Sequence, residues 1–385
     1  MKRTDFSVDW LFAACAPDTE LLPWNAQFTP VGLPHDWQIR HADDLYRDGT
    51  LFYRKYFFVT DVPGTRRMLW FGGAYMDTTV FVNGTEVGQW KYGYTSFWFD
   101  ITDALHEGQN EVLVRCNLRH PNSRWYSGAG LYRNVELWEA PDLHLMPDGL
   151  YVAAKEGDNG AWTVAVTAEV GSVTAASAGR TLTLYLTDDN GSLLGTAAIP
   201  ADAWAALPSP DGWRTGKETT IYKASHTFTL QDPALWDLDA PNFYHITAEL
   251  TGADGVTDTL TTRFGCRTIE ATPDCGLLVN HKRVLIKGVC IHHDFGCLGS
   301  AFEYSAAKRQ LEILKSMGVN SIRTGHTPPA PQFMDLADEM GILMDVESFD
   351  CWRSGKNPYD YGRFFDEWQE KDVAAWIRRD RNHPS

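Results

Sequence analysis

Residues 320–347 read NSIRTGHTPPAPQFMDLADEMGILMDVE, and this stretch decides the fold of the C-terminal part of the chain. Between residues 331 and 340 the apolar side chains recur at the spacing i, i+3, i+4, i+7, and Gly341 follows, which predicts a helix that ends at a glycine cap. The short runs at 320–324 and 342–347, before and after this helix, are predicted to be strands. The stretch is therefore predicted to form a strand, a helix and a second strand.

Similar units flank this one. A strand-like run at 284–291 precedes a helical pattern at 305–317, whose apolar face ends with Met317 and is followed by Gly318. A last helix is predicted over residues 364–379. Three β/α units in succession predict a parallel sheet with helices outside it and right-handed crossovers. The sheet could belong to a (β/α)8 barrel or to an open doubly wound fold, and neither is complete by residue 385.

The N-terminal part of the chain predicts only strands. Short alternating runs, separated by turn residues, lie at 51–60, 67–71, 78–87, 95–101, 111–118 and 131–138. Asn83-Gly84 stands between two such runs and favours a tight hairpin, because a type I′ turn needs positive φ at both positions. Residues 1–140 are therefore predicted to form a β-sandwich.

A second all-β segment begins at Pro141. Its strand-like runs lie at 162–170, 181–187, 221–230, 243–250 and 258–264. This spacing, with Gly, Pro and Asp clusters between the runs, predicts an immunoglobulin-like sandwich over residues 141–268 that contains no helix. The β/α pattern then occupies residues 269–385.

Composition excludes several classes of partner. The chain has 34 Lys and Arg against 50 Asp and Glu, a net charge of −16, which argues against nucleic acid and anionic membranes. No apolar run approaches the roughly 18 residues of a membrane span, and the start lacks the pattern of a signal peptide, so a cytoplasmic protein is expected. The seven Cys are scattered without a C-x-x-C pair. We therefore expect no disulfide framework, zinc site or other metal site, and no cofactor.

Polar residues follow each predicted strand of the β/α segment. The candidate site residues are His292, His293 and Asp294 after the first strand, Arg323 and His326 at the second, and Glu347, Asp350 and Trp352 after the third. Reactive groups in parallel α/β folds gather at the carboxyl ends of strands. Such side chains suit a pocket for a polyhydroxylated ligand, although each could instead cap a loop or form an ion pair at the rim. Consecutive side chains of a strand point to opposite sides, so His292 and His293 are not expected to share a metal ion.

Aromatic residues are concentrated in the first predicted domain. They are Trp90, Tyr92, Tyr94, Phe97, Trp98 and Phe99 in one stretch, followed by Trp125, Tyr126, Tyr132 and Trp138. Sugars stack their C–H faces on such rings, so this composition favours a carbohydrate partner. The alternative is that these rings fill the core of the sandwich.

Six motifs extend over the whole chain: LPHDW at 33–37, FGGAYMD at 71–77, SRWYSGAGLYR at 123–133, KGVCIHHD at 287–294, IRTGHTPP at 322–329 and RNHPS at 381–385. In this order they resemble glycoside hydrolase family 2, which includes β-galactosidases, β-glucuronidases and β-mannosidases. The resemblance implies a multi-domain β plus α/β protein. Its parts would be a jelly-roll sandwich of sugar-binding type, an immunoglobulin-like sandwich and the first three β/α units of a TIM (β/α)8 barrel.

The resemblance also implies a retaining β-glycosidase that hydrolyses terminal O-glycosidic bonds with two Glu residues, an acid/base and a nucleophile. Both are expected beyond Ser385, so the 385 residues contain no assigned catalytic residue and are expected to be inactive alone. Glu347 and Asp350 are interpreted as substrate-side or structural carboxylates.

Other roles follow from the same resemblance. His326 matches a histidine that contacts substrate, His292 matches the histidine after the first strand, and Arg323 matches a structural arginine beneath the site. Two departures from the family pattern are Cys290, where Asn is common, and Val346, where Asp often precedes the Glu.

A third departure concerns the choice of substrate. Arg124 stands where well-known family members place a sugar-binding Asp, and an Arg there could bind the carboxylate of a uronate. The Arg-Trp-Tyr-Ser-Gly pattern favours a β-galactosidase, with a β-glucuronidase or other uronidase as the alternative. A non-catalytic carbohydrate-binding protein is the alternative of another class. Homo-oligomers are common in the family, so a homo-oligomer is a possible assembly.

Overall fold

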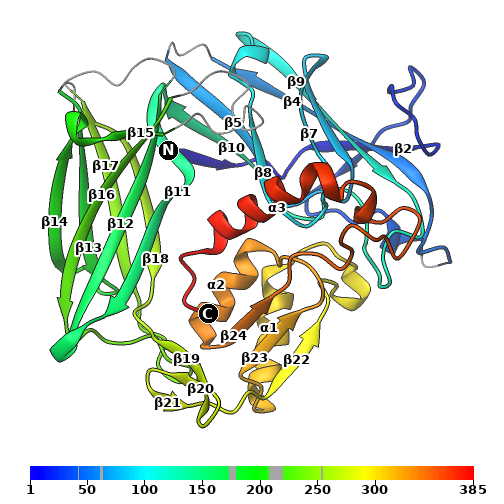
Figure 1. The fold of residues 1–385 in the computed structure, drawn as a ribbon. Coiled ribbons are helices and arrows are strands. Elements are labelled where there is room, and N and C mark those ends of the chain that lie inside the picture. The colour runs from blue at the N-terminus through cyan, green and yellow to red at the C-terminus, as the bar shows by residue number, and fades with distance from the viewer. Residues whose placement is uncertain (42, 61–63, 173–178, 208–219, 253–254) are drawn as a thin grey trace.

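The computed structural model describes residues 1–41, 43–60, 64–172, 179–207, 220–252 and 255–385. Figure 1 shows two β-sandwiches and a smaller α/β part that lies beside both. The fold class is the one expected from the sequence: two all-β segments followed by three β/α units of a parallel sheet.

The N-terminal sandwich consists of two antiparallel sheets with the strand orders β1-β10-β5-β8 and β3-β2-β4-β9-β6-β7. Its strands are β1 Lys2–Asp5, β2 Trp10–Cys15, β3 Thr29–Val31, β4 Gly49–Val59, β5 Thr65–Phe71, β6 Thr78–Val82, β7 Thr85–Trp90, β8 Phe97–Asp100, β9 Gly108–Leu118 and β10 Val135–Pro141. Single turns of 3-10 helix occur at Gln38–Arg40 and Thr102–Ala104. Alternating side chains such as Leu51, Phe71 and Val114 fill the space between the sheets.

The predicted hairpin is confirmed. Asn83 and Gly84 join β6 to β7 with φ angles of 50° and 79°, as a type I′ turn requires. The strands β1 to β3 were not predicted. β1 is exposed along its length, and the three-residue β3 contains Pro30, so neither shows the alternation that identifies a half-buried strand.

The second sandwich has the sheets β11-β12-β16-β15 and β14-β13-β17-β18. Its strands are β11 Leu143–Glu156, β12 Ala161–Ser172, β13 Thr181–Asp188, β14 Leu193–Pro200, β15 Ala205–Leu207, β16 Thr220–Gln231, β17 Tyr244–Gly252 and β18 Gly255–Phe264. In the described part of this segment the helical residues are two 3-10 turns, Asp158–Gly160 and Ala201–Ala203. β11, β14 and β15 were missed by the sequence patterns.

A small sheet of β19 Ile269–Thr272, β20 Gly276–Val279 and β21 Lys282–Arg283 leads into the α/β part. There, β22 Gly288–Ile291, β23 Ser321–Thr324 and β24 Leu343–Val346 form a parallel sheet in this order. The helices are α1 Tyr304–Ser316, α2 Pro331–Met340 and α3 Phe365–Asp380, with 3-10 turns at Gly296–Leu298 and Tyr361–Arg363. The predicted bounds of α2 are confirmed, and Gly341 caps this helix with φ 63°.

One part of the helix prediction is wrong. Met317 was expected on the buried face of the helix over 305–317, but it is 72% exposed. The helix α1 ends at Ser316, and Met317 occupies the C-cap position, where the chain turns towards Gly318. The side chain therefore leaves the face that Ala307 and Leu311 bury.

The α/β part packs closely against the N-terminal sandwich. Figure 1 shows α3 between that sandwich and the parallel sheet. Trp368 of α3 lies edge-on to Trp90, with ring centroids 5.5 Å apart, and the buried Asp372 accepts a hydrogen bond from Thr95 at 2.9 Å. Residues distant in the sequence are thereby brought to the carboxyl ends of β22 to β24.

Candidate active site

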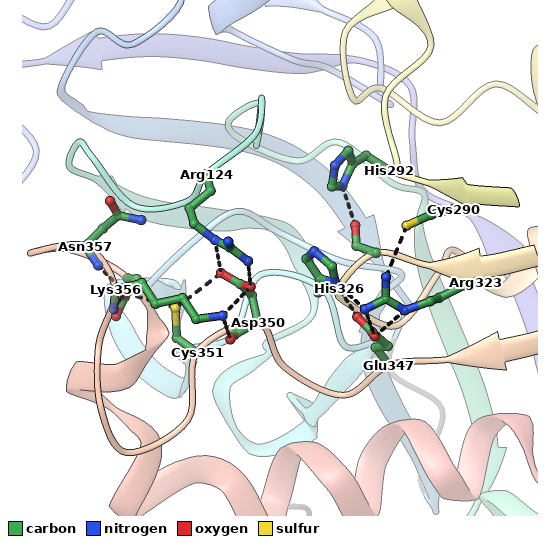
Figure 2. Close-up of polar contacts among 12 residues, drawn as sticks. Arg124, Cys290, His292, Arg323, His326, Glu347, Asp350, Cys351, Lys356 and Asn357 are labelled. Atoms are coloured by element: carbon green, nitrogen blue, oxygen red, sulfur yellow. Dashed lines mark hydrogen bonds and ion pairs between the residues drawn. The ribbon is translucent and has the colours of Figure 1, made fainter.

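The carboxyl ends of the three parallel strands lie side by side. Cys290 pairs with Arg323, and Arg323 pairs with Asp345 on the next strand. These side chains share one face of the sheet, so Nη1 of Arg323 lies 3.6 Å from Sγ of Cys290. Figure 2 shows His292, His326 and Glu347 gathered above this face.

Glu347 connects Arg323 and His326. Its Oε1 accepts a hydrogen bond from Nε of Arg323 at 2.6 Å, and its Oε2 accepts one from Nδ1 of His326 at 2.5 Å. Nη2 of Arg323 also lies 3.2 Å from Nδ1 of His326. Because Nδ1 can donate to Glu347 or accept from Arg323 but not both, we assign its proton from the shorter contact, the one with Glu347. In this tautomer Nε2 carries the lone pair and can accept a hydrogen bond from a sugar hydroxyl.

His292 follows the same pattern. Its Nδ1 donates to the carbonyl oxygen of Gly325, and in the corresponding tautomer Nε2 is again the acceptor nitrogen. The rings of His292 and His326 lie 5.9 Å apart at 79°. Two imidazole acceptors from different strands therefore occupy neighbouring positions.

Trp125 reaches these imidazoles from the N-terminal sandwich. Its indole is stacked on His292, with centroids 5.0 Å apart and planes at 13°. It also meets the ring of His326 at 5.5 Å and 66°. In the sequence Trp125 is one of many aromatic residues of the first domain. No local periodicity indicates that it contacts a segment so distant along the chain.

Arg124 and Lys356 share the carboxylate of Asp350 (Figure 2). Arg124 donates through Nη2 to Oδ1 at 2.5 Å and through Nε to Oδ2 at 3.3 Å, while Nζ of Lys356 donates to Oδ1 at 2.8 Å. Burial raises the pKa of Asp350, but the hydrogen bonds from Arg124 and Lys356 outweigh it and lower the pKa to about 2. Asp350 is therefore ionised and fully engaged, and Lys356 is a second residue that the sequence analysis missed.

The remaining predicted residues lie around this centre. His293 points away from His292: its Nε2 donates to the carbonyl of Ser127 at 2.9 Å, and burial lowers its pKa to about 3, which keeps it neutral. Asp294 is half-buried in the loop that follows. Trp352 is 59% exposed and packs on Phe349, so it presents an apolar ring at the rim.

Most aromatic residues of the first domain belong to the core. Trp90, Tyr92, Tyr94, Phe97, Phe99, Tyr132 and Trp138 are all buried. The core interpretation of these seven rings is confirmed, and Trp125 is the ring that the structure brings to the imidazoles at the strand ends.

The described residues contain neither a metal-binding cluster nor a helix that could span a membrane. Among them, no group of three or more His, Cys, Asp or Glu side chains is arranged to hold a metal ion. No helix in the described part of the chain is long and apolar enough to cross a membrane.

Comparison with known proteins identifies the family. Residues 24–141 match the model described as glycosyl hydrolases family 2, sugar binding domain; residues 148–267 match glycosyl hydrolases family 2; and residues 271–385 match the TIM barrel domain of the same family. The chain therefore belongs to glycoside hydrolase family 2, as its motifs indicated.

Individual relatives agree with this assignment. The chain is 36% identical to the β-galactosidase BoGH2A of Bacteroides ovatus, covering 100% of this chain and 45% of that protein. It is 33% identical to a putative β-glucuronidase of Formosa agariphila, covering 100% of this chain and 36% of that protein. A solved family 2 member from Bacteroides cellulosilyticus superposes with a TM-score of 0.87 at 30% identity, covering 100% of this chain and 51% of that one. The chain thus spans about half the length of these relatives or less.

Proposed function

We propose that this chain forms part of a retaining β-glycosidase that acts on β-galactosides. The catalytic acid/base and nucleophile remain expected beyond Ser385 on the strength of the family resemblance. Glu347 is not proposed for either role, because both of its oxygens are engaged by Arg323 and His326. It is proposed to orient His326.

The engagement of Arg124 supports a neutral sugar over a uronate. Two nitrogens of its guanidinium already donate to Asp350. A uronate carboxylate would have to displace a carboxylate that the chain itself supplies, and it would leave Asp350, with only 7% of its side chain exposed, short of a partner. This is the observation that carries the choice of a galactoside, and the identity to BoGH2A agrees with it.

The proposed role of the described residues is to bind and orient the sugar. Nε2 of His292 and Nε2 of His326 would accept hydrogen bonds from its hydroxyl groups. The indole of Trp125 would hold these two rings from one side, and the loop around Asp350 would form the neighbouring rim. Hydroxyl recognition by several fixed groups gives specificity, because an analogue that lacks a hydroxyl leaves a polar group unpaired.

Hydrolysis of paired aryl glycosides by the full-length protein tests this proposal. We expect release of the aryl group from a β-galactoside, with kcat/KM at least 100 times that for the matched β-glucuronide. Activity on a β-mannoside alone would contradict it. Sugar binding with no hydrolysis of any glycoside would instead favour the non-catalytic carbohydrate-binding protein.

β-Glucuronidase is the second candidate function. Arg124 and Lys356 remain 51% and 43% exposed, so they present two cations at the rim beside one carboxylate, and the Formosa agariphila relative carries that name. A preference for the glucuronide in the same assay, lost in Arg124→Gln and Lys356→Gln, would establish it.

The domain limits at 140/141 and 268/269, the cytoplasmic location and a homo-oligomer stay predictions.

A further inference from the structure

Each imidazole at the strand ends is fixed by a hydrogen bond at Nδ1. His292 donates to Gly325, and His326 donates to Glu347 at 2.5 Å. Together with the covalent link through Cβ, this bond sets where Nδ1 lies, but a single hydrogen bond at one edge restrains the tilt of the ring plane only weakly. The direction in which Nε2 presents its lone pair therefore depends on what contacts the ring faces and edges.

Trp125 supplies that contact for both rings. Its indole lies nearly parallel to His292, at 13°, and steeply inclined to His326, at 66°. A flat ring stacked on another favours parallel planes and so fixes the orientation of its partner. One side chain thus constrains two imidazoles that come from different strands.

Residues before and after Trp125 in the sequence hold it in place through their own contacts. Arg124 is bound to Asp350, and the carbonyl of Ser127 accepts the hydrogen bond of His293. Both anchors join the N-terminal sandwich to the α/β part. The indole is therefore fixed relative to the strand ends and not merely to its own domain.

We propose that Trp125 is a positioning residue, which holds the planes of His292 and His326 so that both Nε2 atoms face the bound sugar. This inference rests on the proposed glycosidase function. Trp125 would act through the imidazoles and not by touching the sugar itself. Because the interaction of hydroxyl groups with these acceptors strengthens as the reaction proceeds, misaligned rings would lower kcat more than they raise KM.

Substitutions of Trp125 in the full-length protein distinguish the effect of its flat ring from the effect of its apolar volume. In Trp125→Leu, which keeps an apolar side chain but no flat ring, we expect kcat to fall 10- to 100-fold and KM to change less than threefold. In Trp125→Phe we expect kcat within about threefold of wild type. Nε1 of Trp125 is buried without a hydrogen-bond partner among the described residues, so phenylalanine removes no hydrogen bond. Trp98→Leu is the matched control, since Trp98 is also partly buried in the N-terminal sandwich but packs on a separate cluster.

An NMR measurement tests the positioning without any activity. In the full-length protein the ring protons of His292, assigned by their loss in a His292→Gln variant, should be shifted upfield by the stacked indole. The shift should vanish in Trp125→Leu and persist in Trp98→Leu. Unchanged histidine shifts in Trp125→Leu, or equal loss of kcat in the Phe and Leu variants, would overturn the inference. A wild-type protein that hydrolyses no glycoside but shows the shift would overturn the proposed function and leave the positioning of the rings intact.

Discussion

Arg124 and Asp350 form an ion pair between the N-terminal sandwich and the loop after β24, although 226 residues separate them in the sequence. The arginine is 51% exposed, whereas the Asp350 side chain is 7% exposed. The carboxylate is thus largely removed from water and depends on its partners for stabilisation. This pair joins the two parts of the chain at the point where Trp125 enters the site.

Removing this arginine should lower stability. In Arg124→Gln we expect the free energy of unfolding to fall by about 1–2 kcal/mol, because Asp350 keeps Lys356 but loses its bidentate partner. Arg353→Gln is the matched control: its pair with Asp366 is as short, at 2.6 Å, but both side chains are exposed, so about 0.5 kcal/mol or less is expected. Urea unfolding of both variants measures the difference, and equal losses of unfolding free energy would contradict the dependence of the buried Asp350 on Arg124.

The low pKa of Asp350 predicts that the protein loses stability at acid pH. Its pKa in the folded protein, about 2, lies below the ordinary value of 3.8. The folded state therefore favours the ionised form, and this contribution is present above pH 3.8 and lost as the pH falls towards 2. The gap in melting temperature between wild type and Asp350→Asn should be widest at pH 6 and narrow by pH 3. A gap that stays constant over this range would contradict the prediction.

Asp372 should show the opposite dependence. Burial between α3 and the N-terminal sandwich raises its pKa to about 7, against the opposing hydrogen bonds from Tyr361 and Thr95. The folded state then holds a proton that the unfolded chain has released, so this contribution to stability is largest below pH 3.8 and declines as the pH rises to about 7. Asp372→Asn should remove this decline. Urea unfolding at pH 5 and pH 8 gives the unfolding free energy of wild type and Asp372→Asn. If both proteins lost the same unfolding free energy between these pH values, the raised pKa of Asp372 would be contradicted.

The parts of the fold that could be predicted are those with local signals. The 3.6-residue periodicity before Gly341 gave the bounds of α2, and Asn83-Gly84 gave the hairpin. These patterns depend on residues within a few positions of one another. The strands β1 and β3 lack such a pattern, since one is exposed throughout and the other is three residues long.

In the candidate site too, some features have a local sequence signal and others do not. The strand ends could be predicted, so His292, His326 and Glu347 were named before their contacts were known. The stacking of Trp125 on His292 depends on how two domains pack, and no spacing within the SRWYSG motif encodes it. For Arg124 the sequence suggested a substrate carboxylate as a partner, whereas the structure supplies Asp350.

Glu347 provides the sharpest test of how the site is held together. In Glu347→Gln the side chain keeps its shape but loses the charge, and one of its two acceptor oxygens becomes an NH2 group, which cannot accept from Arg323 or His326. We expect kcat/KM on the preferred aryl glycoside to fall at least tenfold, with a melting temperature close to that of wild type, because the side chain is 25% exposed and the folded core is unchanged. Glu339→Gln is the matched control, since Glu339 also accepts a hydrogen bond from an arginine, Arg263, at 3.0 Å, but lies on α2 away from the strand ends. The 15N shifts of His326 should change in Glu347→Gln, because Nδ1 loses its charged acceptor. Full activity with unchanged 15N shifts would show that Glu347 does not orient His326.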